Sequence, residues 1–264
     1  MDVKRLVLLS FGAKCLIIMF FGVLIWAHTI FCRKLLNRTT PLSDIKLELK
    51  KGADINMRSK SADDLLRGST PLMIAVKFGL VDRVEYLLNF KLEGSPSVDV
   101  NLQADNKQGD TALHLAARNV IYPYSSPKPG MKILKMLLDN GAEVNKKNNW
   151  GNTPLIAALD VPQENRRRNV VRELIKRGAL INTQNENGKT FLHIAIERGF
   201  GPTVRWFLCN YGKRVVFSLK NKDGDTIEML AKRLKNEPVE QALQDGIKLI
   251  KRKAEGKKVA CDKY

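Results

Sequence analysis

The pattern N-x-x-G-x-T occurs four times in this 264-residue chain, and its recurrence constrains the fold more than any other feature of the sequence. Its threonines, Thr111, Thr153, Thr190 and Thr226, lie 42, 37 and 36 residues apart, and a shorter copy, GSTPLM, begins at Gly68. A pattern that recurs roughly every 20 to 50 residues is typical of stacked units that each contact only their neighbours. The sequence therefore predicts a repeat array.

Each copy of the pattern predicts a tight turn followed by a helix. The asparagine side chain can bond to its own backbone two residues on, and the glycine three positions later allows a positive φ. The threonine then caps a helix, and proline follows it in Thr70–Pro71 and Thr153–Pro154. A second apolar run at helical spacing follows, and three such runs end in the glycine motifs KKGADIN, DNGAEVN and KRGALIN. Each unit is therefore turn, short helix, second helix and glycine stop.

These motifs resemble those of the ankyrin-repeat family, whose unit carries TPLHLAA in its first helix and GADVN after its second. The first-helix copies here are TPLMIAV, TALHLAA, TPLIAAL, TFLHIAI and a divergent TIEMLAK, and the later copies are GADIN, GAEVN and GALIN. The match covers residues 43–245 and about five repeats. The resemblance implies an all-α solenoid of paired antiparallel helices, with hairpin loops projecting from one edge.

Two of the three histidines, His114 and His193, follow the capping threonines Thr111 and Thr190 by three residues. Such a pair could be a nucleophile and its general base. In the family that the motifs resemble, however, the two side chains bond to each other and to backbone, and they link one repeat to the next. The third histidine, His28, lies in an apolar N-terminal segment, so we predict no enzyme, no metal site and no cofactor.

An apolar segment, residues 6–32, precedes the repeats and reads LVLLSFGAKCLIIMFFGVLIWAHTIFC. The 18 residues from Cys15 onward contain no Lys, Arg, Asp or Glu. As a helix they would reach about 27 Å, close to the roughly 30 Å hydrocarbon thickness of a bilayer. We predict one N-terminal transmembrane helix that anchors the chain. The alternative is a cleaved signal peptide, although Ala27–Thr29 is a poor cleavage site.

The basic residues around this segment predict its orientation. Those that follow it outnumber those that precede it, so the repeats of this single-pass protein are expected to face the cytoplasm, and the sequon Asn37–Thr39 is then a chance match. The four cysteines suggest no disulfide framework and favour a reducing compartment. The preceding basic residues are Lys4, Arg5 and Lys14, and the following ones are Arg33, Lys34, Arg38, Lys46, Lys50 and Lys51.

The chain is strongly basic, with a formal net charge of +18, and residues 247–258 concentrate this charge in IKLIKRKAEGKK. Three roles remain open: a solvated helix face, contact with anionic lipid, or nucleic-acid binding. Nucleic acid is the least favoured, because no aromatic residue interleaves the charges of the tail and no binding motif is recognised. We therefore divide the chain into a membrane anchor (1–38), a repeat domain (39–245) and a basic tail (246–264).

Departures from the family's spacing suggest where a partner binds. Extra residues fall between the two helices of the second and third repeats, at 119–130 and 160–168, and a third insertion at 90–99 belongs to the hairpin edge. Because neighbouring repeats stack in parallel, the first two should emerge together opposite the hairpins. They form either a composite partner site or loops that merely tolerate length. The candidate residues are Tyr122, Tyr124, Arg166, Arg167 and Arg168.

Trp150 is a further candidate, since it occupies the turn position where other copies have Gln108, Asn187 and Asp223. It either packs on a neighbouring hairpin or serves as an interface anchor. The resemblance implies partner binding in the groove between hairpins and inner helices. We predict a non-catalytic protein–protein interaction scaffold held at a membrane surface, with a protein partner that the sequence does not identify. The alternative is a basic module that engages anionic lipid or nucleic acid through charge.

Overall fold

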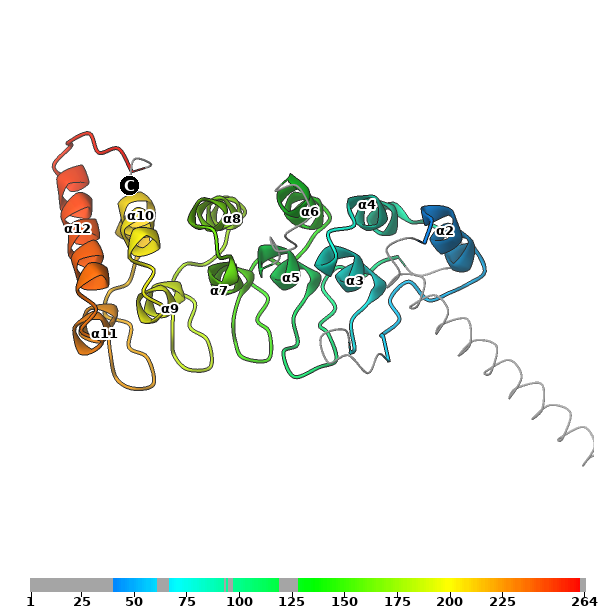
Figure 1. Cartoon of the computed structure of the whole chain (residues 1–264), viewed down its shortest axis with the longest axis horizontal. Coiled ribbons are helices and arrows are strands. Elements are labelled where there is room, and N and C mark those ends of the chain that lie inside the picture. Colours follow the sequence, from blue (N-terminus) through cyan, green and yellow to red (C-terminus); the bar gives the residue numbers. More distant parts are fainter. Residues whose placement is uncertain (1–39, 61–66, 93, 95–96, 119–127, 262–264) are drawn as a thin grey trace, which may run out of the picture.

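The structure is a computed structural model that describes residues 40–60, 67–92, 94, 97–118 and 128–261. Two rows of helices run side by side along this part of the chain (Figure 1). The inner row contains α3 (Pro71–Lys77), α5 (Ala112–Arg118), α7 (Pro154–Ala157), α9 (Phe191–Glu197) and α11 (Ile227–Arg233). The outer row contains α2 (Leu42–Lys50), α4 (Val81–Asn89), α6 (Lys128–Asp139), α8 (Glu164–Lys176), α10 (Gly201–Tyr211) and α12 (Glu237–Ala254). The 3-10 helices η1 (Ala158–Asp160) and η2 (Gly212–Arg214) follow α7 and α10.

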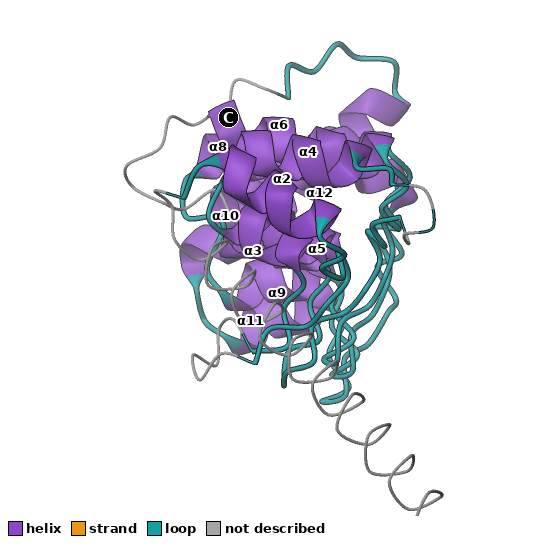
Figure 2. Ribbon diagram, turned by 90° about the vertical axis from the view of Figure 1, so that its right-hand side faces the viewer, coloured by secondary structure: helices purple, strands orange, loops and turns teal. Residues whose placement is uncertain are grey.

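This arrangement confirms the predicted all-α solenoid of paired helices with hairpin loops. The loops that join one helix pair to the next gather along one edge of the molecule (Figure 2). The predicted transmembrane helix in residues 6–32 lies outside the described residues. Within the residues that are described, no helix is both long enough and apolar enough to span a bilayer.

The inner helices begin at the threonines of the repeated pattern. Each threonine hydroxyl accepts a hydrogen bond from the backbone N–H three residues on, which satisfies one of the free donors at a helix start. The N···O distances are 3.3 to 3.5 Å for Thr70, Thr111, Thr153, Thr190 and Thr226.

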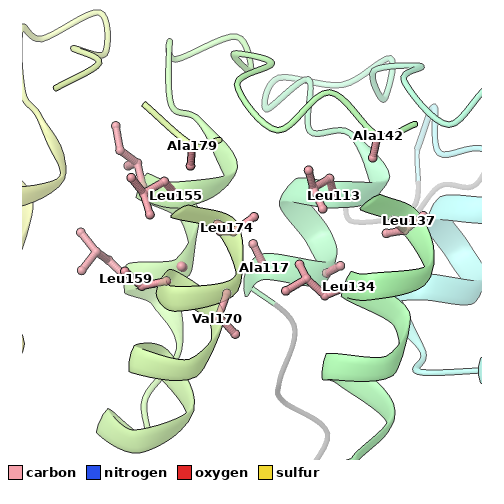
Figure 3. Close-up of a cluster of buried hydrophobic side chains, with 14 of the residues drawn as sticks. Leu113, Ala117, Leu134, Leu137, Ala142, Leu155, Leu159, Val170, Leu174 and Ala179 are labelled. Carbon is pink, nitrogen blue, oxygen red and sulfur yellow. The ribbon is translucent and has the colours of Figure 1, made fainter. Parts of the chain in front are cut away.

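The core lies between the two rows and continues from one repeat to the next. Leu113 and Ala117 of α5 pack with Leu134 and Leu137 of α6, and equivalent side chains of the third repeat follow in the next layer (Figure 3). One cluster of buried residues extends from Ile45 to Leu243. Each repeat therefore buries its apolar face against its neighbours, as expected for a solenoid.

The predicted insertion at 160–168 is mostly helix. Residues 161–163 separate η1 from α8, and residues 164–168 form the first turns of α8. Pro162 ends η1, because a proline disfavours helical backbone in the residue before it. Glu164 then supports the start of α8 through ion pairs with Arg167 and Arg168, at 2.9 and 2.8 Å. The extra residues thus extend an outer helix. Residues 119–127 of the other insertion lie outside the described residues.

Helix α12 runs through the boundary predicted between residues 245 and 246. It packs along α10, and at Gly246 an added Cβ would lie 2.6 Å from Leu208 Cδ1, so the helices approach closely where glycine stands. Val239, Leu243 and Leu249 are buried on the same helix. The first part of the predicted tail is therefore the end of a capping helix. A helix face was one of the expected roles of this segment, but its packing on α10 was not predicted, because that contact is made with a helix distant in sequence.

Cys209 of α10 and Cys261 form a disulfide, with 5.6 Å between their Cα atoms. The sequence suggested no disulfide framework, and it did not predict that this pair is bonded. Both residues are buried, beside Leu249 and Val259. The pairing depends on the chain turning back after α12, which no local pattern near Cys261 predicts. The expected reducing compartment stays a prediction.

Candidate functional site

The inner helices and the hairpins line a groove with a cavity of about 200 Å³ at the second, third and fourth repeats. We call this the inner groove. Its polar lining comes from the ends of α5 and α9, from η1, and from the hairpins before α7 and α9. These polar residues are Arg118, Asn152, Asp160, Asn185, Asn187, Lys189, Glu197 and Arg198.

Asp160 is the centre of the charges in this groove. Its two carboxylate oxygens lie 2.8 Å from Arg118 Nε and 2.6 Å from Arg198 Nη1, so one carboxylate is bridged by arginines of both neighbouring repeats. Arg118 also contacts the buried Asp110. The side chains of Arg118, Asp160 and Arg198 are 24, 32 and 42 % exposed. The Arg198–Asp160 pair is the more exposed of the two and contributes little to stability, so Arg198 can exchange its partner for a ligand. Arg118 Nε is buried, so the Arg118–Asp160 pair is less accessible.

The bridging of Asp160 has a reason in the repeat pattern. In the second, fourth and fifth repeats, the residue before the capping threonine pairs with a residue eight positions later, at the end of the inner helix. In the third repeat the residue before the capping threonine is the neutral Asn152, which cannot pair with Asp160. Asp160 therefore pairs with arginines of the neighbouring repeats instead. Sequence reasoning missed this spacing of eight, although it is visible in the sequence. The pairs are Asp110–Arg118, Lys189–Glu197 and Asp225–Arg233.

His114 is buried and bonded on both ring nitrogens. Nδ1 lies 2.8 Å from Thr111 Oγ1, and Nε2 lies 2.8 Å from the carbonyl oxygen of Asn152 in the next repeat. A carbonyl can only accept, so Nε2 carries the proton and Nδ1 accepts from Thr111. The ring is therefore a neutral link between the second and third repeats. This is the arrangement that the family resemblance implies, and it leaves no nitrogen for a reacting group.

His193 makes the same link from the fourth repeat to the fifth. Its Nδ1 lies 2.8 Å from Thr190 Oγ1, and its Nε2 lies 3.2 Å from the carbonyl oxygen of Asp225. Burial lowers the pKa of both His114 and His193 below the usual 6.5, despite the favourable carbonyl contacts. Both rings therefore stay neutral at pH 7.

Replacing His114 or His193 by alanine should lower the free energy of unfolding by about 1 to 3 kcal/mol, because a buried carbonyl then loses its donor. Urea unfolding followed by circular dichroism measures the change. Partner binding by the folded fraction should be almost unaffected. A variant that unfolds like the parent and yet loses an activity would instead point to a chemical role for the ring.

Stability should also fall as the pH decreases below about 6.5. The pKa of each ring is lower in the folded state, so the unfolded chain binds more protons in this range and acid favours unfolding. Each histidine can contribute a slope of up to about 1.4 kcal/mol per pH unit. Urea midpoints measured between pH 7.5 and 5 should shift less in a variant with His114→Gln and His193→Gln. An equal shift in parent and variant would contradict this assignment.

The residues predicted to bind a partner have different environments. Trp150 is 45 % exposed at a hairpin turn, so it does not fold back completely on a neighbouring hairpin. Arg166 is half-buried on the first turns of α8, and the side chain of Arg168 there is only 11 % exposed. Tyr122 and Tyr124 lie outside the described residues. The composite site as a whole therefore stays a prediction, and Trp150 stays a candidate.

Arg167 is excluded as a partner-binding residue, because its side chain is only 3 % exposed. Its guanidinium donates to the carbonyl of Val161 at 3.0 Å, to Glu164 at 2.9 Å and to Thr203 Oγ1 at 2.8 Å. It also lies 3.8 Å from the ring centroid of Phe200. Arg167 thus joins the start of α8 to α10, and a ligand cannot reach it.

A family model for ankyrin repeats matches the chain three times, over residues 38–124, 124–218 and 161–253. Together these matches span most of the sequence. The chain belongs to the ankyrin-repeat family. The solved ankyrin-repeat domain of Bcl-3 has a similar structure, with a TM-score of 0.57, 27 % identity and coverage of 76 % of each chain.

Several curated proteins are similar in their ankyrin repeats. The mouse (Mus musculus) B-cell lymphoma 3 protein homolog is 29 % identical over 172 residues, and a putative ankyrin repeat protein of fowlpox virus is 34 % identical over 156. These alignments cover 62 and 58 % of this chain but only 35 and 39 % of the relatives. A transient receptor potential cation channel subfamily A homolog of Caenorhabditis elegans is 31 % identical over 121 residues, which are 46 % of this chain and 9 % of the channel. This chain therefore matches only part of each of these relatives.

The ankyrin hairpins are joined by a ladder of asparagines that sequence reasoning missed. The asparagine that ends each GADVN-type motif bonds twice to the next hairpin. Asn145 Nδ2 donates to the carbonyl of Gly178 at 3.1 Å, and Asn145 Oδ1 accepts from the backbone N–H of Leu180 at 2.9 Å. Because these bonds tie each hairpin to its neighbour, they fix the shape of the inner groove. The equivalent residues are Asn56, Asn101 and Asn182.

Gly151 allows two ankyrin hairpins to approach closely. Its φ is +71°, and an added Cβ would lie 2.6 Å from the backbone nitrogen of Glu186. That nitrogen donates to the carbonyl of Trp150 at 3.1 Å. Gly141 also has a positive φ, +83°, but a Cβ added there would meet no atom within 4 Å. Substituting each glycine by alanine therefore distinguishes the energetic cost of backbone strain from the cost of lost contact between the hairpins.

Gly151→Ala should therefore lower the free energy of unfolding by about 2 to 3 kcal/mol, and Gly141→Ala by only about 1 kcal/mol. Both variants place alanine at positive φ, but Gly151→Ala also pushes the next hairpin away. Thermal and urea unfolding of the two variants give the comparison. Equal losses would show that contact between the hairpins contributes nothing beyond local strain.

Proposed function

We propose that this ankyrin domain is a non-catalytic scaffold that binds an extended segment of a partner protein in the inner groove. The observation that carries the proposal is the bridged Asp160, held between Arg118 and Arg198 at the middle of the groove. The three side chains are partly solvent-exposed and meet beside a cavity. Trp150, on the hairpin before α7, adds an exposed aromatic side chain.

The chemistry of the groove favours a segment with both acidic and apolar side chains. A carboxylate of the partner can replace Asp160 at Arg198, because the pair that it displaces is partly solvent-exposed and weak. Arginine can hold the incoming carboxylate through two parallel hydrogen bonds. Trp150 can supply the apolar anchor that dominates many interfaces. The protein-binding roles common among ankyrin domains support the same proposal.

The test is quantitative affinity capture with residues 39–264 as bait. One variant combines Trp150→Ala and Arg198→Ala in the groove. The matched control combines Lys135→Ala and Lys176→Ala, two exposed residues on outer helices. Partners of the groove should be recovered by the parent and by the control, and should be depleted at least about tenfold by the groove variant. Equal recovery by all three baits would exclude the groove as the binding surface.

We further propose that residues 6–32 hold this scaffold at a membrane as a single-pass anchor, with the repeats in the cytoplasm. The support is the length and apolar character of the segment in the sequence, with more basic residues after it than before it. Full-length protein should resist carbonate extraction and keep its N-terminus. A soluble product that begins near Ile30 would replace the anchor with a signal peptide.

A further inference from the structure

The C-terminal end of the solenoid carries exposed basic residues from three separate segments. Three lie on the last turns of α12, two lie in η2, and two lie in the chain after α12. We call this set the basic cap surface. It consists of Lys213, Arg214, Lys248, Lys251, Arg252 and the pair Lys257 and Lys258.

Specific contacts bring the three segments to one end of the fold. Gly212, the first residue of η2, packs so closely on Ile250 that an added Cβ would lie 2.3 Å from Ile250 Cδ1. The disulfide between Cys209 and Cys261 draws the chain after α12 back toward α10. In Figure 1 the end of α12 and the following loop lie at the same end of the solenoid as α10. The basic residues are therefore gathered by tertiary packing as well as by sequence.

Among the residues that the structure describes, few negative charges accompany this surface. The acidic residues of α12 lie in its first half, at Glu237, Glu240 and Asp245. Residues 247–258 contain one carboxylate, Glu255, which lies 2.8 Å from Lys257. Helix α12 thus has an acidic half and a basic half. A face that only needed to stay hydrated could carry mixed charges, whereas charges of one sign create a field that attracts an anionic partner.

We propose that the basic cap surface binds the anionic surface of a lipid bilayer. Five of its seven residues are lysines, whose compact charges on flexible stems suit a diffuse negative surface, whereas arginine dominates specific phosphate recognition. Among the described residues, the aromatic rings near η2 offer a poor stacking platform for nucleic-acid bases, because Phe207 is buried and Tyr211 and Phe217 are only partly exposed. This inference does not depend on the groove proposal, since the two surfaces use different residues.

The test measures the rate of lysine acetylation in the full-length protein after its addition to two kinds of preformed vesicles. One vesicle preparation is phosphatidylcholine alone, and the other contains about one third phosphatidylserine. Lys248, Lys251, Lys257 and Lys258 should be acetylated at least about threefold more slowly on the anionic vesicles, and about 0.5 M salt should remove the difference. The internal controls are three exposed lysines elsewhere on the domain, which should be unaffected: Lys91, Lys107 and Lys135.

A charge-reversed variant, Lys251→Glu with Arg252→Glu, should lose the protection at the remaining cap lysines. A variant with Lys107→Glu and Lys135→Glu carries the same change in net charge and should keep it. Equal protection of cap and control lysines would overturn the proposal, because it would indicate attraction to the whole basic protein. Protection by a mixed-sequence oligonucleotide, with none by anionic vesicles, would also overturn it and would assign the surface to nucleic acid.

Discussion

Replacing Arg167 by alanine should destabilise the domain by about 3 to 4 kcal/mol, with no partner present. The guanidinium satisfies the carbonyl of Val161, the hydroxyl of Thr203 and the carboxylate of Glu164, and it covers the ring of Phe200. Alanine would leave these groups without their donor and open a gap between α8 and α10. The loss should stay near the low end of the range for a broken buried ion pair, because the Glu164 side chain is 31 % exposed and can be hydrated.

Urea unfolding measures this loss, and Arg252→Ala on the exposed face of α12 is the control. That substitution should change the free energy of unfolding by less than about 0.5 kcal/mol. Arg167→Lys should recover only part of the loss, because a single ammonium cannot span acceptors that lie on different sides of a planar guanidinium. If Arg167→Ala unfolds like the parent and loses a captured partner, the residue belongs to a binding site and its structural role is refuted.

The repeats were predictable because their signals are local. A threonine that caps a helix, a proline at its first position and a glycine at positive φ each act within a few residues. Thr153, Pro154 and Gly178 are found in these roles in the structure. The recurrence of such signals then implies stacking, since one helix pair cannot bury its apolar face alone. For this reason local patterns were sufficient to predict the fold class.

The burial or exposure of Arg166, Arg167 and Arg168 was not predictable from the same local signals. Which arginine points inward depends on where α8 begins, and Pro162 and Glu164 set that point. It also depends on Phe200 and Thr203, which lie in the next repeat. From the sequence alone, a run of three arginines between two helices is interpreted as a loop, because the residues that contact it in the folded chain are not known. Burial of Arg167 is therefore a tertiary property.

The inner groove was predicted only in part. Its location followed from the family resemblance, but the bridged Asp160 did not, because its arginine partners lie 38 and 42 residues away in the sequence. The neutral Asn152 was the available clue, since it breaks a pairing that the neighbouring repeats keep. Site residues in a repeat protein are thus easier to find as exceptions to a pairing rule than as motifs.

Reduction of the disulfide between Cys209 and Cys261 should destabilise the C-terminal end of the solenoid by about 4 kcal/mol. The bond closes a loop with a sequence separation of 52 residues, which contains α11 and α12, and the entropy of such a loop in the unfolded chain sets this magnitude. Repeats contact only their neighbours, so the loss should be concentrated in the last two helix pairs. Hydrogen exchange under mild denaturant should show faster opening of residues 227–254 after reduction, with little change in α5 and α6.

Cys261→Ser is the control for that experiment, because reductant should have no further effect on a chain that has lost the bond. Unchanged exchange in residues 227–254 would mean that packing of α12 on α10 fixes the cap without the disulfide.

The state of the bond in cells also tests the proposed orientation. Cytoplasmic thiols are kept reduced, so repeats that face the cytoplasm should carry two alkylatable thiols at Cys209 and Cys261. If alkylation of intact cells finds the pair oxidised, the repeats face the opposite side of the membrane. The sequon at Asn37–Thr39, a chance match for cytoplasmic repeats, would then become a candidate glycosylation site.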